Sequence, residues 1–292
     1  MAAELSVIIV SYNSAGFLRR CLSSIIEQRC HLSVEIIVVD NASKDDSVAT
    51  VERHFPGVRI IKNAENLGFA KANNQGIERA SGRLLLIQNP DTVMLPGSLQ
   101  VLVDFLSRTP DAGAASGRIL NADLTDQGTA RRFPTVSSGL FGRHSLLTRL
   151  LPNNRFSRRY MMTEMRGSTV LYEVDWLSTA SMLVRRAVID EVGGMDEAFF
   201  YWVDGEWCQR IRKGAWRIFC VPAAAVIHEE GKGSGHRTRA MRNRIIIDFH
   251  RGAYRLFCKH YALGPLGIMR YVALGCLSAR ALMQLALNSV RK

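Results

Sequence analysis

The stretch LLLIQNPDTVML, residues 84–95, decides the fold. It opens with four apolar residues, a pattern typical of a short buried strand, and continues at once into Asn89, Pro90 and Asp91. Open α/β sheets bind their ligands where the central parallel strands end, so Asp91 lies at an expected ligand edge. Pro90 makes this corner rigid, and a rigidly held carboxylate suits a divalent metal that carries a diphosphate. On its own, Asn-Pro-Asp is also an ordinary turn sequence.

The segments around this stretch alternate between strand and helix patterns. Strands are predicted at residues 5–10, 35–39, 58–61, 84–87 and 112–120, and helices at residues 17–26, 43–54 and 96–108, with another helix ending at Gly82. We expect Ser43 to cap the second helix and Pro96 to begin the last. This alternation predicts an α/β fold with a mostly parallel central sheet flanked by helices. The chain lacks GxGxxG after the first strand and lacks GxxxxGK[ST], which argues against a dehydrogenase and a P-loop NTPase.

Polar side chains follow four of these predicted segments. Tyr12, Asp40 and Asp91 come directly after strands, and Asn66 lies in the loop after the third strand. Because parallel strands end at one edge of the sheet, we expect the four side chains to gather there. Carboxylate and amide groups at this edge can bind a base and a ribose, while a metal binds the phosphates.

The second half of the chain contains a second group of candidate functional residues, around a predicted helix. A strand is predicted at residues 181–184 and a helix at residues 204–213, whose Trp207, Cys208 and Ile211 share one face. Asp204 and Glu206 then lie at the N-terminus of this helix, where helix electrostatics alone favours acids. The preceding aromatic run FFYW offers a second interpretation, in which an acid beside a pocket wall is a general base.

Composition sets the class of protein. The 292 residues are 47% hydrophobic and 22% charged, as in a globular protein with one large domain or one domain and an appendage. The six cysteines show no metal-binding spacing, which favours reduced thiols in the cytosol. The first residues lack the basic and apolar regions of a secretory signal, so none is expected.

The net charge of +12 is unevenly distributed. Residues 236–292 hold eleven lysines and arginines against one acid, and residues 129–168 hold eight arginines against one acid. Two basic regions on an otherwise slightly acidic body suggest an anionic partner, either membrane headgroups or nucleic acid. The arginines lack the interleaved aromatic residues that single-stranded nucleic acid requires, so no nucleic-acid partner is expected.

The C-terminal tail is rich in leucine and alanine. Its charge-free pieces after Tyr261, such as residues 271–279, are too short for a membrane span, which needs about 20 residues. One interpretation is a basic amphipathic helix lying on an anionic membrane. The other is a helical pair that packs on the main domain or forms a homodimer.

Seven motifs, in order and spacing, resemble the family 2 glycosyltransferases. They read VIIVSYN, VVDNAS, NLGFAKANNQG, NPD, DWLSTASMLVRR, GGMDEAFFYWVDGEWCQR and VIHEEGKGS, and span residues 5–234. The nearest resemblance is to rhamnosyltransferase-like members that build bacterial cell-surface polysaccharides. It implies a GT-A fold in residues 1–235, with a nucleotide-sugar half (1–120) and an acceptor half (121–235), followed by the helical tail 236–292. It further implies a nucleotide-diphosphate sugar donor, Mg²⁺ or Mn²⁺, and transfer with inversion.

The resemblance also assigns site residues. On the donor side it implies Ser11, Tyr12, Asp40, Asn66, Gly68, Asn74 and Asn89. For the metal it implies Asp91 and His228, although His228 is alternatively a strand-end histidine paired with Glu229 or Glu230. The catalytic base implied is Asp204, and the acceptor side comprises Trp176, Tyr201, Trp202 and Glu206. The chain departs from the family pattern at Val203, where a glutamate is usual, and at Glu206, where an aspartate is usual.

The function implied is transfer of L-rhamnose from dTDP-rhamnose to a hydroxyl of a lipid-linked or polysaccharide acceptor. The expected location is cytoplasmic, peripheral on the inner face of the plasma membrane. Two alternatives stay open: a UDP-dependent hexosyl or N-acetylhexosaminyl transferase, and a catalytically silent nucleotide- or glycan-binding scaffold. The basic segment 129–168 is expected to contact the acceptor.

Overall fold

The computed structural model describes residues 3–28, 32–135, 151, 154–229, 238–261 and 267–290. Within these residues the chain forms one nine-stranded sheet in the order β3-β2-β1-β4-β8-β6-β9-β5, with β7 paired to β9. The strands are β1 (Leu5–Ser11), β2 (Val34–Asp40), β3 (Arg59–Lys62), β4 (Leu84–Gln88), β5 (Thr92–Met94), β6 (Ala112–Leu120), β7 (Tyr172–Val174), β8 (Ser181–Arg185) and β9 (Arg217–His228).

The first four strands are parallel and form one half of the sheet. β1 lies between β2 and β4, and all seven of its residues are buried. Its side chains alternate between two cores: Val7 and Ile9 pack on one face of the sheet, and Ile8 packs on the other. Continuous apolar runs such as this one are typical of strands covered on both faces.

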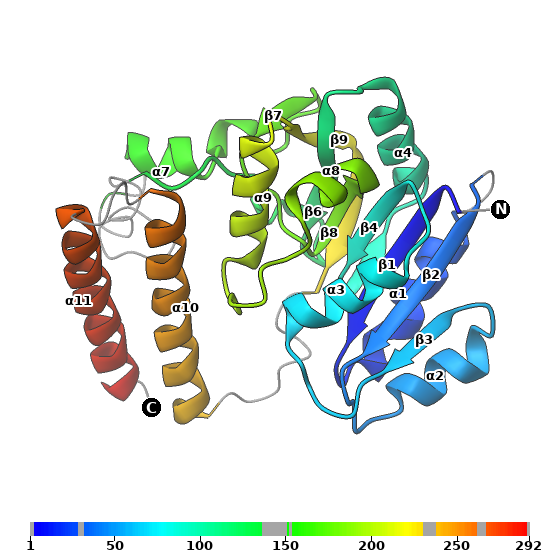
Figure 1. Cartoon of the computed structure of the whole chain (residues 1–292), viewed down its shortest axis with the longest axis horizontal. Coiled ribbons are helices and arrows are strands. Elements are labelled where there is room, and N and C mark those ends of the chain that lie inside the picture. Colours follow the sequence, from blue (N-terminus) through cyan, green and yellow to red (C-terminus); the bar gives the residue numbers. More distant parts are fainter. Residues whose placement is uncertain are drawn as a thin grey trace.

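Helices cover both faces (Figure 1). α1 (Ala15–Ile26), α2 (Ser47–His54) and α4 (Ser98–Arg108) contribute to the core that contains Val7. α3 (Phe69–Arg79), α8 (Arg186–Val192) and α9 (Val203–Lys213) contribute to the core that contains Ile8. The short α7 (Arg155–Tyr160) and a 3₁₀ turn (Thr163–Met165) lie before β7.

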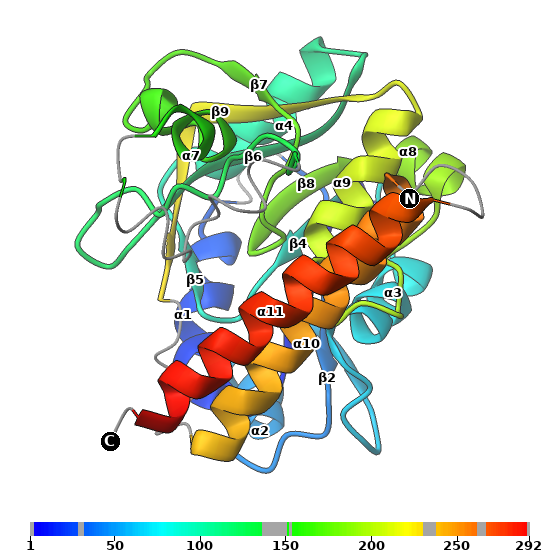
Figure 2. The same cartoon turned by 90° about the vertical axis from the view of Figure 1, so that its left-hand side faces the viewer.

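The tail forms two helices, α10 (Arg239–His260) and α11 (Ile268–Val290). Figure 1 shows them side by side beyond α9, on the opposite side of the molecule from β3. Figure 2 shows α11 lying along the outside of α10. Hydrogen bonds from Arg242 to Asn288 (2.8 Å) and from Asn288 to Asn243 (2.7 Å) join the start of α10 to the end of α11. No described helix is long and apolar enough to cross a membrane.

The α/β prediction is confirmed, with corrections to its details. β5, β7 and β8 run antiparallel to their neighbours, so the sheet is mixed. α2 begins at Ser47 with Asp46 as its N-cap, because the Asp45 carboxylate accepts the Ser47 N–H; Ser43 is therefore not the cap. α4 begins at Ser98, after Gly97 turns the chain with a φ of +78°, and not at Pro96.

Candidate active site

A cleft opens at the carboxyl edge of β1 and β4. Its volume is about 390 Å³, within the range of small-molecule sites. The lining residues are Val10, Tyr12, Asn13, Ser14, Phe17, Asn41, Asn66, Gly68, Phe69, Asn89, Pro90, Asp91 and Phe200. Four predicted donor-side residues, Tyr12, Asn66, Gly68 and Asn89, therefore share one cleft with the predicted metal ligand Asp91.

Ser11 and Asp40 lie side by side where β1 and β2 end. One Asp40 oxygen accepts the Ser43 N–H at 3.0 Å, whereas Oδ1 is buried without a hydrogen-bond partner. The buried Ser11 hydroxyl also lacks a partner. Because unpaired buried polar atoms are costly, these two atoms are suited to hydrogen-bond a ligand. Beside them Tyr12 is half-exposed and offers a ring on which a base can stack.

Asn41 holds the loop on the far side of the cleft, and the sequence analysis missed it. Its side chain donates to Asn66 Oδ1 (2.9 Å) and accepts from the Leu67 N–H (3.0 Å). Asn66 Oδ1 also accepts the Gly68 N–H at 3.0 Å, and Gly68 has a φ of +85° that favours glycine. The motif NLG thus forms a turn fixed by the buried Asn41. The position of Asn41 directly after Asp40, at the end of a buried strand, is the signal in the sequence that indicates this role.

Asn89, Pro90 and Asp91 form the tight connection between β4 and β5. Asn89 N–H donates to Ala180 O at 2.9 Å, and Thr92 Oγ1 donates to Asn89 O at 2.6 Å. The Asp91 carbonyl accepts the Glu229 N–H at 2.9 Å. The predicted rigid corner is therefore anchored to β8 and to the end of β9 as well as stiffened by its proline.

Asp91 and His228 meet at this corner. His228 ends β9, where it pairs with Thr92 of β5, and its Nε2 lies 3.4 Å from Asp91 Oδ1. Asp91 Oδ1 and the neighbouring Asn89 Oδ1 are buried oxygens without hydrogen-bond partners. Adjacent ligands of an octahedral ion bound at about 2.1 Å lie roughly 3 Å apart, so the pair fits a divalent cation. The alternative pairing of His228 with Glu229 is not seen, because Glu229 binds Arg20 at 2.6 Å; Glu230 lies outside the described residues.

The described residues supply only part of a coordination shell. Among them, no three His, Cys, Asp or Glu side chains come together as a metal cluster. Mg²⁺ and Mn²⁺ in phosphate-binding sites are often held by one or two protein ligands, with substrate phosphates and water completing the shell. Asp91 and His228 fit that kind of site, in which the ion is shared with a bound diphosphate.

Asp204 lies in the first turn of α9. Burial raises the pKa of its carboxyl group, against the nearby Arg131 charge and a hydrogen bond from Trp176, which lower it. The Trp176 ring packs on the backbone of α9, since a Cβ on Gly205 would lie 3.0 Å from it. Arg131 in turn lies over the Trp176 ring, 5.2 Å from its centroid. A carboxylate whose pKa is raised toward neutrality is suited to accept a proton.

Comparisons with known proteins agree with this geometry. The family model for glycosyl transferase family 2 matches residues 6–193. This chain belongs to that family. It is 30% identical over 247 residues to the N-acetylglucosaminyl-diphospho-decaprenol L-rhamnosyltransferase of Mycobacterium tuberculosis, covering 80% of this chain and 79% of the relative. The rhamnosyltransferase-like assignment made from the motifs is confirmed.

Solved structures show the same fold. A mannosyltransferase from Pyrobaculum calidifontis, in complex with GDP-Man and Mn²⁺, matches the whole chain and 77% of its own length, with a TM-score of 0.58 and 19% identity. GalNAc-T7, crystallised with UDP, GalNAc and Mn²⁺, matches 94% of this chain and 54% of its own length, with a TM-score of 0.59 and 17% identity. The GT-A glycosyltransferase fold is thereby confirmed.

Two predicted site residues of this glycosyltransferase have other roles in the structure. Asn74 does not line the cleft: its amide bonds both the N–H and the carbonyl of Met195 at 2.8 Å. It therefore fastens α3 to the loop that precedes α9. Glu206 is fully buried and binds Arg210, Lys259 and His260, so its carboxylate is not available to an acceptor. It joins α9 to α10.

The aromatic residues before α9 lie in two different surroundings. Phe200 is exposed and lines the cleft, whereas the Trp202 indole donates to Phe249 O of α10 at 3.0 Å. Trp202 packs between Trp176 and Phe249, at ring distances of 5.3 and 4.9 Å, and Tyr201 lies 6.1 Å from Phe249. Tyr201 and Trp202 thus contact the tail, and Phe200 is the residue of the run that faces the donor side.

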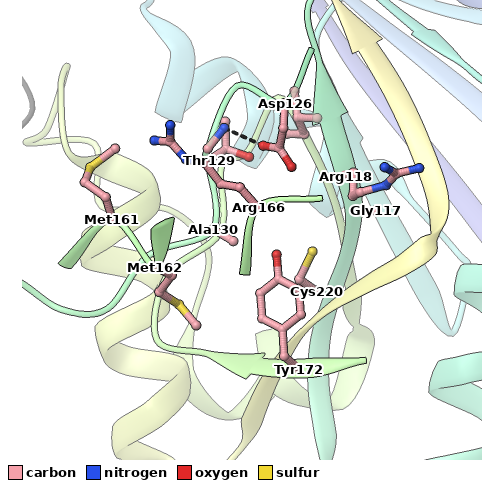
Figure 3. Close-up of a pocket in the computed structure, with 12 residues that line it drawn as sticks. Gly117, Arg118, Asp126, Thr129, Ala130, Met161, Met162, Arg166, Tyr172 and Cys220 are labelled. Carbon is pink, nitrogen blue, oxygen red and sulfur yellow. Dashed lines mark hydrogen bonds between the residues drawn. The ribbon is translucent and has the colours of Figure 1, made fainter. Parts of the chain in front are cut away.

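A second cavity, drawn in Figure 3, shares no lining residue with the cleft. It is lined by residues that include Arg166, Tyr172 and Cys220, and its volume is about 10 Å³. That is room for about one water molecule and not for a sugar or a nucleotide. The larger cleft is therefore the candidate active site of this glycosyltransferase.

Proposed function

We propose that this glycosyltransferase is a metal-dependent, inverting enzyme that transfers L-rhamnose from dTDP-rhamnose to a hydroxyl of a lipid-linked glycan. The observation that carries the proposal is the pairing of Asp91 with His228 at the edge of a cleft that is also lined by Tyr12, Asn66, Gly68 and Asn89. The M. tuberculosis relative, named for a decaprenyl-linked acceptor and L-rhamnose, supports both substrate assignments.

Each polar group has a task in donor binding. Tyr12 stacks on the base, and Ser11 and Asp40 accept or donate hydrogen bonds at the base and ribose. Asn66 and Gly68 close the nucleotide side of the cleft. Asp91 and His228 hold the divalent ion, which, when bound, neutralises charge on the leaving diphosphate.

Asp204 is the base in a single displacement. The acceptor hydroxyl oxygen attacks the anomeric carbon as the bond from that carbon to the diphosphate oxygen breaks, and the hydroxyl proton passes to Asp204. Attack opposite the leaving group inverts the anomeric configuration. One base suffices, and no covalent intermediate with the protein is needed. Burial raises the pKa of Asp204, and the Arg131 charge opposes this effect by favouring the ionised carboxylate.

We further propose that the enzyme works peripherally on the inner face of the plasma membrane through residues 236–292. Arg270 and Arg280 are the charged residues of α11, and both are half-buried. The exposed residues of this helix include Ile268, Tyr271, Val272, Leu282 and Leu287. An uncharged helix face of this kind inserts at a bilayer surface, and exposed arginines of α10, such as Arg244, would meet anionic headgroups. A homodimer through the same face is the alternative.

Donor turnover with a purified polyprenyl-diphospho-sugar acceptor tests the transfer. We expect dTDP-rhamnose to be consumed with Mn²⁺ or Mg²⁺, not with a chelator, and a thermal-shift panel to single out the nucleotide. A ligand at 100 times its Kd stabilises by about 2.7 kcal/mol, an easily measured shift. Asp91→Ala should abolish the metal-dependent shift, and Asp190→Asn, at an exposed position on α8, is the matched control.

Other outcomes point to the alternatives. A shift with UDP-sugars alone would indicate a hexosyl or N-acetylhexosaminyl transferase. Nucleotide binding without transfer to any acceptor would indicate a scaffold. The buried Val203, at a position where the family usually has a glutamate, favours this alternative. Residues 136–150 and 152–153 of the basic segment predicted to contact the acceptor lie outside the described residues.

A further inference from the structure

The side chain of Gln127 contacts His228, the predicted metal ligand, at the ring nitrogen Nδ1. It is 5% exposed, and it lies where the chain returns from a turn beyond β6, with its N–H donating to Ile119 O at 2.9 Å. The turn is closed by the Asn121 N–H, which donates to Thr125 O at 2.8 Å. This route brings the Gln127 amide to His228 at the end of β9.

Two hydrogen bonds fix the Gln127 amide against His228. Gln127 Nε2 donates to the His228 backbone carbonyl at 2.6 Å, and Gln127 Oε1 lies 3.1 Å from His228 Nδ1. A carbonyl only accepts, so the nitrogen of the amide must face it. The amide oxygen therefore faces the ring, and His228 Nδ1 must carry a proton to donate to it.

This arrangement leaves the other ring nitrogen, Nε2, facing Asp91. With the proton on Nδ1, the neutral His228 ring has a lone pair on Nε2, which faces Asp91 Oδ1 at 3.4 Å. Two acceptor atoms at this distance repel unless a cation lies between them. Both His228 and Gln127 are buried, so water competes little for these contacts.

We propose that Gln127 is a positioning residue that holds His228 in the Nδ1-protonated tautomer and so presents Nε2 to a divalent metal ion. The proposal rests on the metal site in the proposed function. Hydrogen-bonded partners of metal-binding histidines fix ring orientation and tautomer, and their loss typically weakens metal binding 10- to 100-fold. Gln127 supplies that partner through an amide, where a carboxylate or backbone carbonyl is more usual.

The first measurement is the tautomer of His228 in the metal-free protein, read from the ¹⁵N resonances of its ring. His228→Gln identifies its signals among those of the seven histidines. We expect the wild type to carry the proton on Nδ1, and Gln127→Leu to lose this preference. A wild-type proton on Nε2 overturns the proposal without reference to metal, donor or activity.

The second measurement is the affinity for Mn²⁺, alone and with dTDP, followed by the electron paramagnetic resonance of free Mn²⁺. We expect Gln127→Leu to raise the Kd of Mn²⁺ about 10- to 100-fold. Gln127→Glu, which keeps an oxygen at Nδ1, should lose less. Binding of Mn²⁺ by Gln127→Leu as tight as that of the wild type overturns the proposal.

Gln209→Leu is the matched control. Gln209, on α9, is also a buried glutamine, and its amide donates to the Tyr261 hydroxyl instead of contacting His228. Gln209→Leu should have a lower Tm than the wild type and the same Kd for Mn²⁺. If Gln209→Leu and Gln127→Leu lose the same affinity for Mn²⁺, the loss reflects general destabilisation and contradicts the proposal. If the wild type binds Mn²⁺ and transfers sugar, and Gln127→Leu binds Mn²⁺ equally tightly, only the role of Gln127 is refuted and the metal site stands. A wild type that binds no Mn²⁺ refutes the proposed metal site as well.

Discussion

The Glu206 carboxylate lies 2.7 Å from Lys259 Nζ, and this ion pair joins α9 to the tail helix α10. Glu206 is two residues beyond Asp204, and Lys259 also binds Asp196, at 2.6 Å, in the loop before α9. Trp202, the N-cap of α9, has a φ of +71°, which is unusual for a bulky residue, and it is held by its bond to Phe249 of α10. The tail therefore supports the segment that carries Asp204, the proposed base.

Removal of the Glu206 charge should destabilise the fold. In Glu206→Gln, Arg210 and Lys259 lose a fully buried partner, and breaking a buried ion pair costs about 3–5 kcal/mol. We expect a clear drop in the urea midpoint of unfolding. Glu191→Gln, at an exposed position on α8, is the control. An unchanged midpoint in Glu206→Gln would contradict the support that α10 gives to α9.

The same cluster predicts a loss of stability in acid. Burial would raise the pKa of Glu206, but hydrogen bonds from His260, Arg210 and Lys259 outweigh it and hold the pKa far below its usual range. A depressed folded-state pKa contributes stability that is present above the unfolded-state pKa and is lost as the pH falls below it. The free energy of unfolding should thus decline below about pH 4.5, and less steeply in Glu206→Gln.

Asp204→Asn should separate activity from stability. Loss of the base should lower transfer by about 10²–10⁴-fold. The raised pKa of Asp204 means that ionisation costs the folded state stability, a cost that grows as the pH rises above the unfolded-state pKa of about 3.9. Asp204→Asn should therefore have a higher Tm than the wild type at neutral pH, and the difference should vanish below pH 4. A lower Tm at neutral pH, or retained transfer, would refute the assignment.

Replacement of Tyr12 should weaken donor binding without changing the stability of the fold. Its half-exposed ring at the cleft contributes through stacking, and aromatic pairs of this kind are worth about 0.5–1.5 kcal/mol. Tyr12→Ala should raise the KM for the nucleotide sugar about 2- to 10-fold, with the Tm unchanged. Tyr271→Ala, which removes an exposed tyrosine from α11, should leave this KM as it is.

The donor half was largely predictable because its signals are local. A continuous apolar run followed by Asp40, or by Asn89 and Asp91, identifies a buried parallel strand and its ligand edge within about ten residues. β9 is not among the predicted strands; it contains Pro222, and a proline is unusual in a central strand. The structure accommodates Pro222 at a register shift between β6 and β9, where the ladder is interrupted.

The roles of Glu206 and Gln127 depend on distant partners. Lys259 and His260 come from a helix whose docking no local pattern reveals, so the resemblance alone placed Glu206 on the acceptor side. Gln127 follows a polar turn without periodicity and meets His228 from 101 positions away. Asn74 was assigned from its motif, while its actual partner, Met195, lies 121 positions further on. Local sequence identifies candidate side chains, and tertiary contacts decide which of them face the cleft.

The exposed face of α11 gives the last prediction. Leu282 is 67% exposed on that helix, so Leu282→Glu should leave the fold intact. A carboxylate on an inserting face opposes both burial in the interface and attraction to anionic lipid, so binding to vesicles containing phosphatidylglycerol should fall. Leu124→Glu, at a leucine 61% exposed in the turn beyond β6, should bind vesicles as the wild type does. A change of oligomeric state in Leu282→Glu, with vesicle binding unaffected, would instead assign this face to a homodimer. The introduced carboxylate would then disrupt a contact between two protomers and not a contact with lipid.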